Sequence, residues 1–193
     1  MLMDIIKRLN WVDTLVIIAF IRICYISVKS GLPVEIFKLL GTVSAIYFSL
    51  HYYTILSDSV QQRVSTGNLP LEFLDFSVFI LCAMIGYAAL VLLRMIFYRF
   101  IQMEAVPNLN KWGGLMLSVV RGFLFASLII FAMAISSITY LKVSVKKSYF
   151  GNQLFAVSPK TYAWVWNSIT SKFMSGEKFN ETINEVQERF AQE

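Results

Sequence analysis

Side chains able to do acid–base chemistry are few in this sequence. There is one histidine, His51, and a set of acids spread over the apolar runs and the connections between them. These acids are Asp13, Glu35, Asp58, Glu72, Asp75 and Glu104. With scattered serines they are the ingredients of hydrolysis, but no HExxH, CxxC, GxSxG, Walker or GxGxxG pattern accompanies them. We therefore expect no catalytic residue, no metal site and no cofactor.

Two of these residues have simpler structural explanations. His51 begins the sequence HYY (residues 51–53), where an apolar run ends. Such an aromatic and polar cluster is typical of the belt at the headgroup level, so we expect His51 there. Asp13 follows Trp11 at the start of another apolar run, where an acid favours the helix dipole and suggests capping. A membrane hydrolase that uses Asp13, Glu35 or His51 is the least supported functional alternative.

The composition places the chain in a membrane. Of its 193 residues, 57% are hydrophobic and 15% are charged, and the mean hydropathy is +0.63. Ordinary soluble domains are about 45–50% apolar and about 25% charged. The net charge is +5, but the basic residues are spread along the chain and several flank apolar runs, as interfacial anchors do, so we expect no nucleic-acid partner. Cys24 and Cys82 lie inside apolar runs, which favours plain packing.

The apolar runs predict an all-α polytopic membrane protein with four transmembrane helices and C-terminal amphipathic or interfacial helices. A bilayer-spanning helix needs roughly 20 mostly apolar residues. We expect a membrane domain over residues 1–141, with spans at about 11–29, 34–56, 73–99 and 112–141. We expect a polar tail over 142–193. The tail mixes aromatic residues such as Trp164 and Trp166 with Lys160 and Lys172, and such a mixture suits a segment on the membrane surface.

Small residues recur at every fourth position in two of the predicted spans. They are Gly41, Ala45 and Ser49 in the second span, and Gly114, Ser118, Gly122 and Ala126 in the fourth. Residues four apart share one helix face, and small side chains let two helices approach closely in lipid. These stripes predict packing seams, either within one bundle or toward a partner or a second copy of the chain.

Two arginines lie within predicted spans, Arg22 in the first and Arg121 in the fourth. An arginine at the centre of a membrane helix costs about 2.5–3.5 kcal/mol on insertion scales, so it normally pairs with an acid, faces a polar cavity or reaches the headgroups. Three acids are candidate partners for Arg121, namely Asp13, Glu35 and Asp75. Alternatively, residues 109–120 form a separate interfacial or re-entrant segment that leaves Arg121 near the headgroups.

Several of these motifs together resemble the colicin V production protein family, CvpA. They are Trp11 to Asp13 (WVD), a hinge at Gly31 followed by Glu35, HYY, and LNKWGGLMLSVVRGFLFAS over residues 109–127. The last is the most specific, and in it the family pattern falls on Asn110, Lys111, Gly114, Arg121 and Gly122. The sequence departs from the pattern at Ser30, where the family has a basic residue, and at Ser118, where it has a glycine.

The resemblance implies a multi-pass protein of the bacterial inner membrane, linked to colicin V production or export and to envelope homeostasis, with no established enzymatic activity. By analogy with relatives, both termini face the periplasm. The preferred hypothesis is a non-enzymatic adaptor or scaffold, whose partners are the lipid bilayer and export or envelope proteins. The alternative is a small channel or transporter component that works as a homo-oligomer.

Overall fold

The computed structural model describes residues 9–64, 70–100, 107–174 and 176–192. Over these residues the chain is helical and contains no strand. Four of its helices are long and apolar enough to cross a membrane. They are α2 (Trp11–Ser30), α3 (Leu32–Val64), α4 (Leu71–Phe100) and α5 (Pro107–Ile135). The predicted all-α fold with four candidate membrane spans is therefore confirmed.

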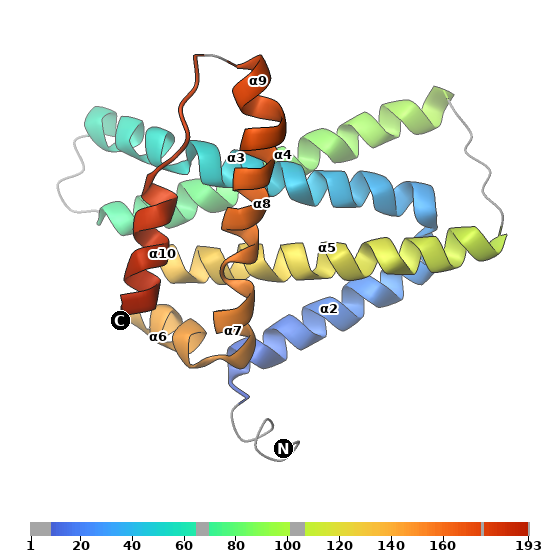
Figure 1. Ribbon diagram of the computed structural model, residues 1–193, viewed down its shortest axis with the longest axis horizontal. Helices are drawn as coiled ribbons and strands as arrows, with labels where there is room; N and C mark the ends of the chain where they lie inside the picture. Colours follow the sequence, from blue (N-terminus) through green and yellow to red (C-terminus); the bar gives the residue numbers. More distant parts are fainter. Residues whose placement is uncertain (1–8, 65–69, 101–106, 175, 193) are drawn as a thin grey trace.

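Helix α5 is the centre of the bundle. In its 18-residue apolar stretch, 56% of the residues are buried inside the protein, whereas the corresponding fraction is 22% in α2 and 17% in α4. Helix α2 packs mainly against α5, whereas α3 contacts both α4 and α5. Figure 1 shows this arrangement, with α5 between α2 on one side and the α3–α4 pair on the other. A central helix must be apolar on most of its surface, as α5 is.

Helices α3 and α4 approach closely because Gly86 has no side chain. A Cβ atom added at Gly86 would lie 2.9 Å from the carbonyl oxygen of Ser44 and 3.1 Å from the Cα atom of Ala45. On the same face of α3, Gly41 leaves room for the ring of Tyr87, which would be 3.1 Å from an added Cβ. Small residues on both helices thus set the distance between them.

Three helix ends differ from those expected from hydropathy, and the first is the start of α5, which lies at Pro107 and not near residue 112. Helix α5 ends at Ile135, and not near residue 141, because the chain turns at Ser136, whose hydroxyl accepts a hydrogen bond from the Ile138 backbone amide (3.1 Å). Helix α3 continues to Val64, beyond residue 56, through a polar segment. Because a helix rises about 1.5 Å per residue, residues 57–64 extend α3 past the predicted end of the span.

The tail forms short helices that lie across the long ones (Figure 1). They are α6 (Thr139–Lys147), α7 (Tyr149–Leu154), α8 (Val157–Val165), a π-helical turn η1 (Trp166–Thr170), α9 (Ser171–Phe173) and α10 (Thr182–Gln192). Phe155 stacks on Phe131 of α5 and on Phe190 of α10, with ring centroids 5.5 Å and 4.0 Å apart. The backbone amide of Ser158 donates to the Ser127 hydroxyl of α5 (2.7 Å). The tail therefore belongs to the same packed core as the spans.

The close approach at Gly86 gives a direct test of this packing. Gly86→Leu should lower the free energy of unfolding by about 1–3 kcal/mol, because the new side chain must push α3 and α4 apart. Thermal unfolding of the detergent-purified protein measures this. Ala89→Leu is the matched control, since Ala89 is exposed on the same helix. Equal melting temperatures for the two variants would contradict a close approach of α3 and α4 at Gly86.

Candidate functional site

The hinge between α2 and α3 is held by the first turns of α5. Gly31 adopts a positive φ of 78°, a conformation that side chains disfavour. The Asn110 side chain fills the space beside it, and its Oδ1 accepts a hydrogen bond from the Leu32 backbone amide (2.6 Å). Asn110 thereby caps α3 from a different helix. Close by, the Ser27 hydroxyl donates to the Gly114 carbonyl (2.7 Å), so α2, α3 and α5 meet at this point.

A buried cluster of charges lies just inside the hinge. Glu35 is fully buried, and its two carboxylate oxygens lie 3.0 Å from Arg121 Nη2 and 2.7 Å from Lys38 Nζ. The Arg121 contact is an ion pair whose atoms are not aligned for a hydrogen bond. Lys38 also donates to the hydroxyl of Ser30 (2.8 Å). One carboxylate thus faces two cations.

This cluster settles which acid partners Arg121. Of the three candidates, Glu35 is in contact, whereas Asp75 accepts a hydrogen bond from Ser57. Asp13 instead binds the tail. Helix α5 is continuous from Pro107 to Ile135, so residues 109–120 are not a separate interfacial or re-entrant segment.

A groove of about 750 Å³ opens along α2 beside this cluster. Most of its lining is apolar, and its charged lining residues among those described are Arg22, Lys38 and Arg121. Arg22 is exposed and has no ion-pair partner within the described parts of the chain. The Nε atom of Arg121 is buried without a hydrogen-bond partner. The groove therefore carries more positive charge than Glu35 neutralises.

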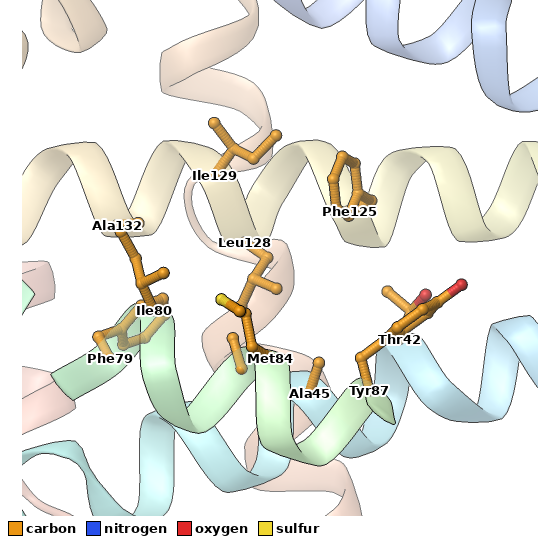
Figure 2. Close-up of a pocket in the computed structure, with 11 residues that line it drawn as sticks. Thr42, Ala45, Phe79, Ile80, Met84, Tyr87, Phe125, Leu128, Ile129 and Ala132 are labelled. Atoms are coloured by element: carbon orange, nitrogen blue, oxygen red, sulfur yellow. The ribbon is translucent and has the colours of Figure 1, made fainter. Parts of the chain in front are cut away.

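A second groove, of about 400 Å³, is almost wholly apolar. Figure 2 shows it between α4 and α5, with Thr42 and Ala45 of α3 at one side. Tyr87 and Phe125 line both this groove and the basic one. The two grooves therefore meet at these aromatic side chains.

At the opposite end of the bundle, Asp13 joins α2 to the tail. Its carboxylate accepts hydrogen bonds from the backbone amides of Asn10 (2.8 Å) and Phe150 (2.8 Å) and from the Ser148 hydroxyl (2.5 Å). It therefore caps its own helix, as its position suggested, and also the first turn of α7. The Trp11 indole donates to the Ser144 hydroxyl (3.0 Å). Asp13, which the sequence suggests only as a helix cap, therefore also attaches the tail to α2.

His51 does not lie in a lipid-facing belt, contrary to expectation. It is 1% exposed, and its ring nitrogens contact the Tyr162 hydroxyl (2.9 Å) and the Glu177 carboxylate. The tail folds over the middle of α3 and covers the ring, which also stacks on Trp166. Neither Tyr162 nor Glu177 stands out in the sequence, because only the folded tail brings them to His51.

The hydrogen bonds of His51 attach the tail to α3. Burial, together with the nearby hydroxyls and carboxylate, raises the pKa of Tyr162 to about 12, so its hydroxyl stays neutral near pH 7 and is a poor nucleophile. The hydrogen bond from His51 holds the pKa of Glu177 below its usual value. Asn180, on the same tail segment, donates its amide to the Leu50 carbonyl (2.6 Å). The His51–Tyr162–Glu177 group therefore fastens the tail to α3.

The remaining predicted residues lie mostly between helices of this chain. Gly122 faces Phe20 of α2, whose ring would be 2.7 Å from an added Cβ. Gly114 lies against the backbone of Gly31. The small residues of both stripes are buried, namely Gly41, Ala45, Ser49, Gly114, Ser118, Gly122 and Ala126. Lys111 is exposed at the hinge end. Within the described residues, no three His, Cys, Asp or Glu side chains are grouped to hold a metal ion.

Comparison with known families gives one decisive result. The family model described as colicin V production protein matches residues 12–177, a range that includes the hinge, the charge cluster and most of the tail. The chain belongs to the colicin V production protein family. Comparisons with curated proteins and with solved structures gave no significant match. The resemblance seen in the sequence is therefore confirmed.

Membership of the colicin V production family supports a role in colicin V production. The family is not a known family of enzymes. The four long apolar helices fit a multi-pass membrane protein.

The buried carboxylate gives the first prediction from the site. Glu35→Gln should destabilise the protein by about 3–5 kcal/mol, because Arg121 and Lys38 would remain largely buried without their anion. Glu72→Gln is the control, since the Glu72–Lys142 pair (3.0 Å) is partly exposed and such pairs contribute about 0–1 kcal/mol. Thermal unfolding in detergent compares them. A Glu35 variant as stable as the Glu72 variant would show that the cluster does not hold the hinge.

The Glu177 contact predicts a dependence on pH. Because the pKa of Glu177 is lower in the folded protein than its usual value of 4.5, its contribution to stability is complete above about pH 4.5 and is lost as the pH falls through the folded value. The melting temperature of the parent protein should exceed that of Glu177→Gln at pH 7, and the difference should shrink as the pH falls below 4.5 and through the lowered folded-state pKa. Glu181→Gln, an exposed neighbour, is the control. A difference that stays constant with pH would refute the assignment.

Proposed function

We propose that this protein is a non-enzymatic adaptor or scaffold of the bacterial inner membrane that acts in colicin V production or export and in envelope homeostasis. The observation that carries the proposal is the anchored tail. Asp13, His51 and Ser127, from three different long helices, all bind tail residues through polar contacts. A segment fixed at so many points is a rigid platform and not a loose arm.

The platform leaves large apolar side chains uncovered. Trp164 of α8 is 63% exposed, Ile169 of η1 is 51% exposed, and Phe173 of α9 is 82% exposed. Aromatic residues on a rigid support are typical anchors in protein–protein interfaces. Exposed aromatic side chains also suit contact with lipid headgroups. The proposal assigns this surface, called here the tail platform (Trp164, Ile169 and Phe173), to an export or envelope protein.

The orientation forms part of the proposal. The start of α2 and the tail lie at the same end of the bundle, because Asp13 binds Ser148 and Phe150. By analogy with the family, this end faces the periplasm. A phosphatase reporter fused to the C-terminus should then be active in cells, and a reporter that works only in the cytoplasm should be silent. The reverse result would place the tail platform in the cytoplasm.

One observation favours a second candidate, a small channel or transporter component. The basic groove beside α2 is open to the side, so a second copy of the chain could close it into a polar path. Anion flux into liposomes that is lost in Arg121→Leu and unchanged when the tail platform is altered would favour this alternative.

The tail platform gives the functional prediction. In a colicin V-producing strain that lacks the chromosomal copy of this gene, the triple variant Trp164→Ser, Ile169→Ser, Phe173→Ser should lower secreted colicin V roughly tenfold or more, as loss of aromatic anchors does in interfaces. Trp112→Ser is the control, because Trp112 is 64% exposed at the opposite end of the bundle. Membrane levels of the parent and both variants should be equal.

The proposal fails if the triple variant restores secretion as well as the control does. A photo-crosslinking residue at position 173 separates partner from membrane. Adducts with one export or envelope protein support an adaptor, whereas adducts with lipid alone would reduce the tail platform to a membrane anchor and contradict it.

A further inference from the structure

The basic groove beside α2 has an unbalanced charge. Three cations line it, and Glu35 is the acid in contact with two of them. Within a membrane such an excess is unfavourable unless an anion compensates it. Arg22 in particular needs a compensating anion, because it is exposed on a helix that is long and apolar enough to span the membrane. The groove therefore has the electrostatic properties of an anion site.

Arg22 and Arg121 lie at similar depths in the bundle, on neighbouring helices. Ser27 of α2 and Gly114 of α5 are at one level, since their side-chain and backbone oxygens are hydrogen-bonded. At about 1.5 Å per residue, Arg22 and Arg121 lie roughly 7 Å and 10 Å deeper than this level. Arginine side chains can reach several ångströms toward the interface. Arg22 is about 12 Å from the hinge end of α2, and Arg121 is in the middle of α5, so an anion bound between them would lie within the apolar layer, where the cations most need a counter-charge.

The apolar groove in Figure 2 supplies the second half of the site. It begins at Tyr87 and Phe125, where the basic groove ends, and continues along α4 and α5 past Met84 and Leu128. It is open on one side, and Met84 is 62% exposed. A basic groove that leads into an apolar groove matches a molecule with an anionic head and a hydrocarbon chain.

We propose that these joined grooves bind an anionic phospholipid. Its phosphate accepts charge-assisted hydrogen bonds from Arg22, and Arg121 and Lys38 add attraction at the same site. One acyl chain passes Tyr87 and Phe125 and lies in the apolar groove between α4 and α5. The inference is independent of the tail platform, which lies on other helices.

Lipid titrations of the full-length protein in detergent test this proposal. The probes are dioleoyl phosphatidylglycerol, dioleoyl phosphatidylcholine with the same chains, and soluble glycerol phosphate. Phosphatidylglycerol should raise the melting temperature, and the other two should not. Native mass spectrometry should show one phosphatidylglycerol molecule retained by each protein molecule. Arg22→Gln should weaken this binding roughly tenfold, through loss of one charge-assisted contact.

Two further variants keep the experiment decisive. Arg63→Gln makes the same substitution at an exposed arginine outside the groove and should bind phosphatidylglycerol as the parent does. Arg22→Lys keeps the charge and should retain most of the binding, which separates loss of charge from loss of folding.

Several results would overturn the proposal. Equal responses to the two phospholipids would show that the charge is not recognised. An equal response to glycerol phosphate would identify a site for soluble anions. Unaltered binding by Arg22→Gln would remove the site from this groove. A lipid-free dimer that Arg22→Gln dissociates would make a second copy of the chain the occupant.

Discussion

The contact on which the rest of the structure depends is the Glu35 carboxylate between Arg121 and Lys38. It neutralises charge that the apolar layer would otherwise exclude, and it joins the first turns of α3 to the middle of α5. Asn110 adds a cap from α5 to α3 at the same hinge. With α5 fixed in this way, α2 can pack along it through Gly122, and α4 can pack on the other face of α3. The asymmetry of the charges then leaves a basic groove beside α2.

The sequence predicts those features that depend on local patterns. Long apolar runs identify the four spans, and the spacing of Gly41, Gly114 and Gly122 identifies faces of close packing. It could not select the partner of Arg121, because three acids were available and their distances depend on how the helices cross. It also misplaced His51, since nothing near residue 51 shows that the tail returns to cover it. Long-range contacts between residues far apart in the chain have no local signature.

The two ends of the bundle differ in kind. The hinge end contains buried charges and a groove that opens into the apolar layer. The tail end is closed by hydrogen bonds of Asp13 and His51 to the tail, and aromatic rings such as Trp166 and Phe179 pack there. Helix α5 touches both, because Arg121 and Ser127 lie on the same helix. Since α5 is rigid and mostly buried, a ligand at one end and a partner at the other would act on a single structural element.

The contacts of Asp13 also constrain how the protein is made. Asp13 lies near the start of the chain, but its partners Ser148 and Phe150 are synthesised only after all four long helices. Until the tail has been made, Asp13 can therefore bind only Asn10 among its final partners. Helix α2 is therefore made before the hydrogen bonds at its N-terminal end can be completed by the tail. If translation stopped before the tail, the four long helices would be present, but Asp13 would lack its hydrogen bonds from Ser148 and Phe150.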